Sequence, residues 1–533
     1  MKRHFENLHL IDLLALSMFL VFVVTWINNP THAAFYKMYD ISLYVVAYSL
    51  LRMFALWNMR LLGRIVSIAI ALAALWQITY ALLQMLGVYE SHNYLYPMTG
   101  SFNNPGPFGG FLAVCASILI PCCIKEENRL LKILYALSAV LSLIVMPATL
   151  SRTSLLAFGV SMLVYGISHK RIRRQFKRYW MVIVLIISVA VTTAYLYKKD
   201  SADGRAYINK ISLSAIQSNG IKGSGLANYA SSYGKSQTEY FAPHIEDILQ
   251  AKETVKIERE RMIADCPAYA FNEYLELGVE CGVVGLIIYL LLISVSITTL
   301  YREQSVWCYG LIALSIFALF SYPFKMMLFC VMLAFFVAIT GIKPGKNRTL
   351  FPVYVTFLMA LVFVMAGYSR YKTAKVAERS LEKAMTLYDI KYYEAFTEEC
   401  VSFQDALLHK YSFMFAFGQS LNKCGEYAKS DSILEMGAAI SSDPMFWNVM
   451  GNNAKALQQY DRAEECYLRA FNMLPNRLYP LTLLAELYYA TGDSCAFIRM
   501  KDIVNNFKPK VESVQTEKLR EEINSLSFNC YSD

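Results

Sequence analysis

The sequence predicts an all-α, polytopic membrane protein with about eleven transmembrane helices and a C-terminal soluble α-solenoid. Of the 533 residues, 56% are hydrophobic and only 17% are charged, and the mean hydropathy is +0.35. A soluble protein of this length would be markedly more polar. Apolar runs long enough to cross a bilayer of about 30 Å recur up to residue 370. From residue 371 the sequence becomes charged, aromatic and alanine-rich. We therefore divide the chain into a membrane domain, 1–370, and a soluble helical domain, 371–533.

Turn-forming and polar residues separate the expected spans. Pro147 and the triplet Ser151-Arg152-Thr153 divide one long apolar run into a hairpin. The first run lacks a small-residue cleavage site, so we interpret it as a retained anchor and not as a signal peptide. The expected spans lie near 9–27, 41–57, 63–87, 107–124, 131–150, 152–168, 179–197, 274–300, 306–322, 325–341 and 350–368.

The basic residues predict the orientation, because cytoplasmic connections are enriched in lysine and arginine. Alternate connections contain Arg60, Arg64, Lys125, Arg129, Lys132, Lys170, Arg171, Arg173, Arg174, Lys177, Arg178, Arg302, Lys343, Lys346 and Arg348. The opposite connections contain little beyond Lys37, Arg152 and Lys325. We expect a bacterial inner-membrane protein with a cytoplasmic N-terminus, a periplasmic loop at 198–273 and a periplasmic C-terminal domain. This topology explains the net charge of +9 without a nucleic-acid partner.

The sequence of the soluble domain contains a repeated pattern. Pro475 and Pro509 lie 34 residues apart, which is the period of a tetratricopeptide repeat. Small and aromatic residues recur around them, and the pattern between about 411 and 511 resembles that family. Two interpretations stay open: a concave groove for a partner such as a peptide, a glycan carrier or another membrane protein, and a stabilising cap over the loop 198–273.

The strongest candidate for a reaction centre is the segment 271–285, where a polar stretch enters an apolar run. Asn272, Glu276 and Glu280 recur every four residues and share one helical face. Together with Glu273 they are the candidate catalytic residues, since carboxylates at the mouth of a span are costly and often functional. A polar helix-packing stripe is the alternative interpretation. Gly282 and Gly285 leave a second face smooth enough for close packing.

Three further segments are expected at the same face of the membrane. They are Gly100–Phe108, which contains Asn104-Pro105; Ser151–Thr153; and the loop residues Gly204–Lys210 with Gly220–Gly225. The arginine in the second and third segments offers a planar fork that can bind phosphate oxygens in pairs. A simple turn, an interfacial arginine and a solvated charged loop are the respective alternatives.

Taken together, these segments resemble the O-antigen ligase and polymerase superfamily over about residues 95–300. Ser151-Arg152, Gly204-Arg205 and Gly223-x-Gly225 are similar to its helix start and periplasmic loop. Asn104-Pro105 is similar to its Asn-Pro-Asn turn, although Gly106 stands where the second asparagine is common. The pattern Phe271-Asn272 with Gly282-x-x-Gly285 is similar to its His-Asn signature, but Phe271 replaces the histidine.

The resemblance implies a glycosyltransferase that moves a glycan from an undecaprenyl-diphosphate carrier to lipid A core, a protein hydroxyl or a growing glycan. No metal or other cofactor is implied. Arg152, Arg205 and Lys222 would hold the diphosphate. Two options stay open for the missing histidine: Glu273 takes over as base, or the reaction proceeds without a base while Asn272 and the carboxylates align the acceptor hydroxyl. Asn104, Pro105, Gly223, Gly225, Gly282 and Gly285 would be structural. Two other classes are compatible with the sequence: a transporter or flippase of a lipid-linked or anionic solute, and a non-catalytic assembly protein.

Overall fold

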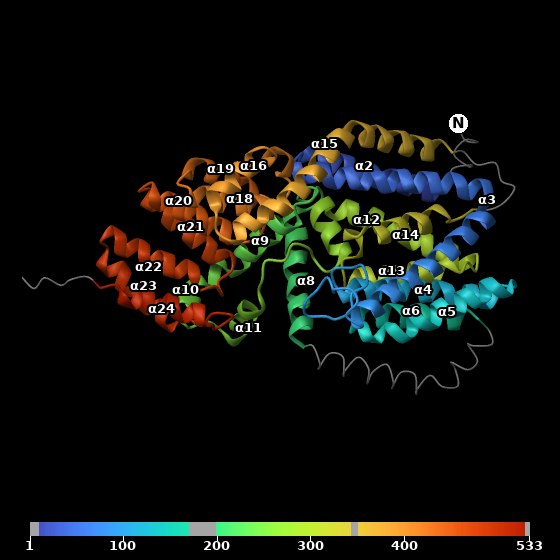
Figure 1. The fold of residues 1–533 in the computed structure, drawn as a ribbon, viewed down its shortest axis with the longest axis horizontal. Helices are drawn as coiled ribbons and strands as arrows, with labels where there is room; N and C mark the ends of the chain where they lie inside the picture. The colour runs from blue at the N-terminus through green and yellow to red at the C-terminus, as the bar shows by residue number, and fades with distance from the viewer. Residues whose placement is uncertain (1–9, 170–198, 343–349, 528–533) are drawn as a thin grey trace, which may run out of the picture.

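The computed structural model describes residues 10–169, 199–342 and 350–527, and all regular structure in these ranges is helical. The all-α prediction is therefore confirmed for this part of the chain. Figure 1 shows an elongated molecule with the apolar helices at one end and the C-terminal helices at the other, separated by α8–α11. The span expected near 179–197 lies outside the described residues.

In the ranges that the structure describes, the apolar end contains nine helices. They are α2 (Leu10–Asn28), α3 (His32–Met85), α4 (Pro105–Lys125), α5 (Arg129–Val145), α6 (Arg152–Ser168), α12 (Glu273–Arg302), α13 (Trp307–Leu319), α14 (Met327–Ala338) and α15 (Phe351–Asp389). Within the described ranges, six are long and apolar enough to cross a membrane, and α6, α13 and α14 are shorter. These helices identify a membrane protein, whereas the count of eleven spans stays a prediction.

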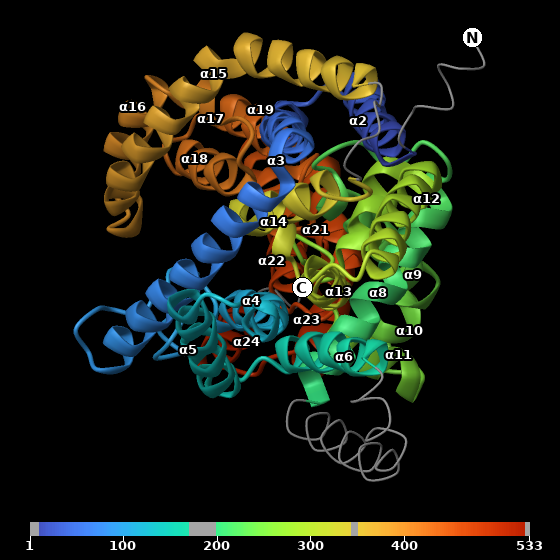
Figure 2. The ribbon, with the colours of Figure 1, turned by 90° about the vertical axis from the view of Figure 1, so that its right-hand side faces the viewer.

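The expected spans 41–57 and 63–87 form the two halves of α3. The helix is interrupted at Asn58, whose φ of −150° and ψ of 84° are not helical. The Asn58 side chain accepts a hydrogen bond from the Leu61 N–H at 3.0 Å, as an N-cap residue does at a helix start. Figure 2 shows the resulting change of direction between the two halves.

The segment predicted as a loop, 198–273, is largely helical. It contains α8 (Lys199–Asn219), α9 (Tyr229–Phe241), η2 (Ala242–His244), α10 (Ile245–Leu249) and α11 (Val255–Ile263). Tyr207, Ile211 and Ala215 recur every four residues and are at most 3% exposed, so α8 has one buried face despite its charge. Figure 1 shows α8 lying across the end of the apolar bundle.

The C-terminal region is a series of short helices. They are α16 (Tyr393–Val401), α17 (Gln404–Leu407), α18 (Tyr411–Lys423), α19 (Tyr427–Ala438), α20 (Met445–Ala456), α21 (Tyr460–Met473), α22 (Tyr479–Thr491), α23 (Ser494–Asn506) and α24 (Val514–Ser525). Gly418 packs against Leu434, and Gly451 against Tyr467, without room for a Cβ. Close pairing of α18 with α19 and of α20 with α21 depends on these glycines. Assignment to the tetratricopeptide family stays a prediction.

The C-terminal helices are joined to the rest of the chain in two ways. The helix α15 continues without interruption through residue 370, where we placed the domain boundary. Buried side chains of α8–α11 and of α20–α24 also form a single apolar cluster, which includes Tyr233, Phe241, Phe471 and Phe507. The predicted periplasmic loop and tail therefore share a core.

Candidate functional site

The helix α12 begins at the expected polar segment, and Asn272 is its N-cap. The Asn272 Oδ1 accepts hydrogen bonds from the backbone N–H groups of Tyr274 at 3.1 Å and Leu275 at 3.2 Å. Asn272 has the extended backbone of an N-cap. Its oxygen is therefore engaged in starting the helix that carries the three glutamates.

Glu276 and Glu280 lie on one face of α12, as the sequence predicted, and each is paired with lysine. Lys37 Nζ of α3 lies 2.6 Å from Glu280 Oε2 and 3.4 Å from Glu276 Oε1. Lys325, in the turn η3 (Pro323–Lys325), also pairs with Glu276. Both carboxylates are at most 4% exposed, and such burial is tolerable only because opposite charges accompany them.

Glu273 is bound differently. Its Oε1 accepts a hydrogen bond from the Phe324 N–H at 2.7 Å, and the residue is 8% exposed. Within the described ranges, no lysine, arginine or histidine nitrogen lies within 4 Å of its carboxylate. Of the three glutamates, Glu273 is thus the one without a direct ion pair.

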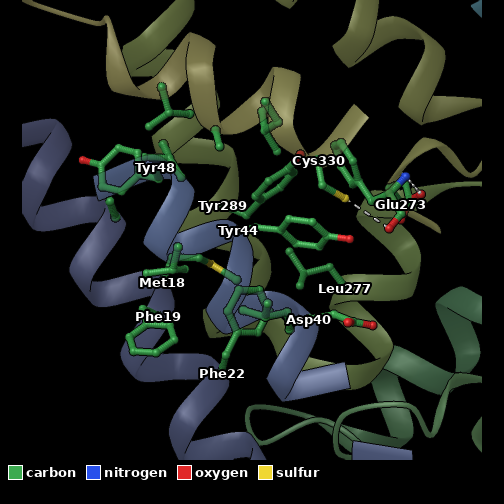
Figure 3. Close-up of a pocket in the computed structure, with 18 of the residues that line it drawn as sticks. Met18, Phe19, Phe22, Asp40, Tyr44, Tyr48, Glu273, Leu277, Tyr289 and Cys330 are labelled. Atoms are coloured by element: carbon green, nitrogen blue, oxygen red, sulfur yellow. Dashed lines mark hydrogen bonds between the residues drawn. The ribbon is translucent and has the colours of Figure 1, made fainter. Parts of the chain in front are cut away.

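A cavity of about 460 Å³ lies beside these groups, between α2, α3, α12 and α14. Figure 3 shows the polar ends of Glu273, Asp40 and Tyr44 on one side of it, while Met18 and Phe19 line another part. The walls are mostly aliphatic and aromatic. The arrangement is an apolar chamber with carboxylates and lysines at one end, suited to an amphipathic ligand.

The predicted glycines bring the loop after α8 onto α12. At Gly282 the backbone of α12 is not helical, with φ of 69° and ψ of −177°. The Gly220–Gly225 loop enters at this break: the Ser224 N–H donates to the Val279 carbonyl at 2.8 Å, and the Gly225 N–H to the Glu280 carbonyl at 3.0 Å. A Cβ on Gly223 or Gly282 would collide with the opposing backbone.

Gly285 has a separate packing role on the same helix. A Cβ at this position would lie 3.3 Å from Val21 Cγ1 of α2, which is tighter than ordinary contact. The absence of a side chain therefore allows α12 to approach α2, the helix that lines the cavity opposite Glu273.

The two predicted arginines come together from different helices. Arg152 is the first residue of α6, and Arg205 lies in α8, not on a flexible loop as we had predicted. Arg205 Nη1 donates to the Phe320 carbonyl at 2.7 Å. Burial and the nearby positive charge of Arg152 lower the pKa of Arg205. Two cations this close, one of them half-buried, create an environment that favours an anion.

Lys222 is separated from this pair. It is exposed and follows the far end of α8. The stretch of helix from Arg205 to Asn219 alone is about 21 Å long at 1.5 Å per residue. The three predicted phosphate ligands therefore do not converge; Arg152 and Arg205 do.

The Asn104-Pro105 turn packs beside Arg152. Asn104 caps α4 by accepting the Gly106 N–H at 2.9 Å, and Pro105 is the first residue of that helix. A Cβ on Gly109 would lie 2.8 Å from Ser154 Oγ, so α4 and the start of α6 are in close contact. The turn thus supports the helix start that carries Arg152.

Phe271, the residue before the N-cap of α12, joins an aromatic cluster. Its ring centroid lies 4.9 Å from that of Tyr269 and 5.4 Å from that of Tyr322, and Arg205 Cζ lies 5.3 Å from it. Its φ of 52° is unusual for a bulky residue. This residue links the arginine pair to the start of α12.

Two residues of this site were not predicted to belong to it, namely Lys37 and Lys325. The sequence did contain a signal for them, since they are the lysines that break the charge pattern of the outer connections. What it could not indicate was that their partners are Glu276 and Glu280, which are far away along the chain.

A comparison with known protein families finds a match in the region of the chain that contains these residues. Residues 137–290 match the family model described as O-antigen ligase. The matched range includes Arg152, Arg205 and Glu273 but not the Asn104-Pro105 turn. No curated protein and no solved structure matches the chain. The match supports a place in the O-antigen ligase superfamily and, in a general sense, a role in glycan transfer.

Proposed function

We propose that this protein transfers a glycan from an undecaprenyl-diphosphate carrier to an acceptor at the periplasmic face of the bacterial inner membrane. The acceptor is lipid A core, a protein hydroxyl or a growing glycan. The observation that carries the proposal is the meeting of Arg152 and Arg205 at the end of the apolar bundle, inside the range matched by the ligase family.

The arginine pair suits a lipid diphosphate. A diphosphate carries enough negative charge to interact with two neighbouring cations at once. Each guanidinium has several N–H donors in a planar fork that complements phosphate oxygens. Arg205 keeps donors beyond the one that binds Phe320.

The cavity beside Glu273 suits the apolar part of such a carrier. Three of the helices that form its walls, α2, α3 and α12, are long and apolar enough to cross a membrane, and its charged end lies where α12 begins. A polyprenyl chain occupying it would place its headgroup at that end.

The reaction then requires an acceptor hydroxyl at the anomeric carbon of the donor sugar. A new C–O bond forms there, while the bond to the diphosphate breaks and its electron pair leaves with the diphosphate. Glu273 takes the hydroxyl proton, because its carboxylate has no direct ion pair within the described ranges. Glu276 and Glu280, which lysines neutralise, hold α12 and α3 in position.

The experiment is a transfer assay in proteoliposomes that measures release of undecaprenyl diphosphate. Arg152→Ala and Arg205→Ala should each reduce release by about a hundredfold or more, a loss of about 2.7 kcal/mol in transition-state stabilisation. Arg152→Lys should recover part of the rate, because lysine keeps the charge without the fork. Arg499→Ala, at an exposed position in α23, is the matched control. Wild-type release by both alanine variants would remove the arginines from the mechanism.

A further inference from the structure

A second cavity, also about 460 Å³, lies between α9 and the C-terminal helices α19–α21. Unlike the chamber beside Glu273, it has many hydroxyl and amide side chains among its lining residues, including Ser224, Asn228, Ser231 and Thr238, alongside apolar and charged ones. Its opposite wall includes Trp447 and Arg469. Apart from Ser224, whose backbone docks on α12, these residues do not belong to the site described above.

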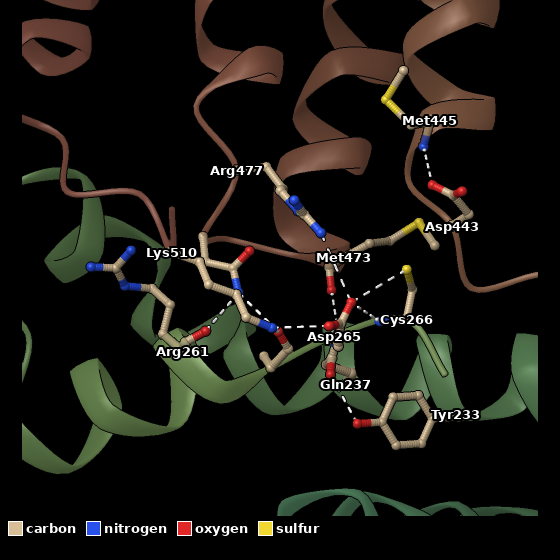
Figure 4. A network of polar contacts seen from close by, with 12 residues as sticks. Tyr233, Gln237, Arg261, Asp265, Cys266, Asp443, Met445, Met473, Arg477 and Lys510 are labelled. Carbon is tan, nitrogen blue, oxygen red and sulfur yellow. Dashed lines mark hydrogen bonds and ion pairs between the residues drawn. The ribbon is translucent and has the colours of Figure 1, made fainter. Parts of the chain in front are cut away.

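The walls of this cavity are held in fixed relation. Gly234 of α9 lies so close to the connection between α19 and α20 that a Cβ on it would be 2.9 Å from Ser442 Cβ. One turn further, Gln237 Nε2 donates to the Met473 carbonyl at 2.8 Å; Figure 4 shows the two residues at this junction. The cavity is therefore a built feature of the contact between α9 and the tail.

Asn228 contributes a buried acceptor that the protein leaves unused. The residue is 7% exposed, and its Nδ2 donates to the Ser224 carbonyl at 3.0 Å. Its Oδ1 is buried and has no hydrogen-bond partner in the described part of the chain. A buried acceptor costs about 1–3 kcal/mol unless a donor reaches it.

Trp447 and Arg469 form a flat wall of mixed character. The Arg469 Cζ lies 3.6 Å from the centroid of the Trp447 ring, which is a stacked cation–π arrangement. The guanidinium covers one face of the indole, and the rest of the indole is an apolar surface that a sugar ring can contact, while the guanidinium offers N–H donors at its edge.

We propose that this cavity binds oligosaccharide. A sugar ring has an apolar C–H face and hydroxyls around its edge, and these match an aromatic wall surrounded by serine, threonine and asparagine. The charged residues of the lining, Lys235, Glu239 and Arg469, leave one net positive charge, which is compatible with neutral or acidic sugars. A lipid would leave these polar groups unpaired.

The cavity is connected to α12 by the loop after α8. Ser224, which lines it, donates through both its N–H and its Oγ to the Val279 carbonyl, at 2.8 and 3.1 Å. Val279 lies between Glu276 and Glu280. If the proposed function is correct, sugars in this cavity are remote parts of a glycan whose reacting end is at α12. Binding remote parts of a substrate helps to position the reacting end.

The test is calorimetric titration of the full-length protein in nanodiscs with two probes. One is oligosaccharide released by mild acid from the host's lipid-linked glycan, and the other is glycan released from the finished acceptor. Trp447→Ala and Asn228→Ala should weaken binding at least tenfold, and Trp447→Phe should restore part of it. Trp76→Ala, at an exposed position on α3, is the matched control.

The probe that binds more tightly identifies whether donor or acceptor glycan occupies the cavity. Absence of binding by the wild-type protein to both probes would overturn the inference, and so would wild-type affinity in both Trp447→Ala and Asn228→Ala. Arg152→Ala should bind the probes normally. If Arg152→Ala and Arg205→Ala also transfer glycan normally, the proposed arginine mechanism fails while the sugar-binding inference stands.

Discussion

Glu273, Glu276 and Glu280 lie within two turns of α12, yet their different partners make them unequally suited to accept a proton. Lys37 and Lys325 neutralise Glu276 and Glu280, so removal of either carboxylate leaves a lysine with fewer partners. Glu273 is held by one backbone N–H donor. A carboxylate that acts as a general base must accept a proton without losing an ion pair. Of the three glutamates, Glu273 meets this condition best.

The Glu273→Gln variant tests this assignment. Glutamine keeps the shape and can still accept the Phe324 N–H, but it cannot take a proton. Transfer should fall about a hundredfold, the usual scale for loss of a general base, while binding of the lipid-linked donor is retained. The isosteric control is Glu280→Gln. This substitution removes a charge partner of Lys37, so it should lower the thermal midpoint of the protein while most of the transfer rate is retained. Unchanged transfer by Glu273→Gln would exclude it as the base.

Gly282 permits a second prediction at the level of one residue. Its φ of 69° and ψ of −177° suit only glycine, and the Ile221 carbonyl occupies the space of a Cβ. Gly282→Ala should therefore lower the thermal midpoint of the protein by several degrees, since strain of about 1–3 kcal/mol accompanies such a backbone. Differential scanning fluorimetry would measure this change in the thermal midpoint.

Gly220 provides the matched control for this experiment. Its φ is 62°, and nothing lies within 4 Å of the position of its Cβ. Gly220→Ala therefore has the backbone penalty without the collision, and its effect should be clearly smaller. Equal effects of the two substitutions would contradict the docking of the Gly220–Gly225 loop into the break of α12.

The joint between α15 and the start of α3 connects the tail to the apolar bundle. The His409 ring centroid lies 3.9 Å from that of Tyr36, and Arg370 Cζ lies 4.4 Å from the Phe35 ring centroid. Burial and the charge of Lys410 lower the pKa of His409 to about 4, although Glu378 opposes the shift. The folded protein therefore keeps this imidazole neutral.

This shift predicts acid sensitivity of the joint. An unfolded histidine titrates near about 6.5, so below that pH the unfolded chain binds a proton that the folded chain excludes. The stabilisation is complete above about pH 6.5 and decreases as the pH falls toward about 4. Thermal midpoints between pH 7.5 and 4.5 should show a shallower decline for His409→Gln than for the wild-type protein. The exposed His92→Gln should retain the wild-type slope.

The elements differ in how well the sequence predicts them. Apolar runs and caps predict α4 and α12 closely, because Asn104-Pro105 and Asn272 are strong local signals for a helix start. The helical nature of 198–273 was missed, because charged residues conceal the four-residue spacing of Tyr207, Ile211 and Ala215. Spacing also placed Glu276 and Glu280 on one face, but their pairing with Lys37 and Lys325 depends on contacts distant in the sequence.

At the scale of the whole molecule, the positive-inside pattern predicts which end faces the periplasm. Alkaline phosphatase fused after Ser369 should be active, because the tail and the segment 198–273 are expected to be periplasmic. A fusion after Lys177 should be inactive. An active fusion at Lys177 would reverse the orientation and place the arginine pair in the cytoplasm.

The shared core of the tail and the segment 198–273 changes what a deletion would do. Asn476 Nδ2 donates to the Arg261 and Ala264 carbonyls at 2.7 and 3.0 Å, and Figure 4 shows the neighbouring pair of Asp265 and Lys510. Removal of 411–533 would expose buried residues of α8 and α9, including Tyr233 and Phe241, so a substitution at the junction is a more informative test than a deletion.

A charge exchange across this junction provides that perturbation. Lys510 Nζ lies 2.9 Å from Asp265 Oδ2; burial opposes ionisation of Asp265, but Lys510 lowers the pKa of its carboxyl. Asp265→Lys should loosen the junction by placing two cations together, and Lys510→Asp should do so by placing two carboxylates together. Chymotrypsin digestion should therefore release tail fragments faster from either single variant, and the double exchange should restore protection. Because α8 carries Arg205, both single variants should also slow glycan transfer if the tail holds α8–α11 against the bundle. Loosened junctions with wild-type transfer would show that the tail does not position the arginine pair.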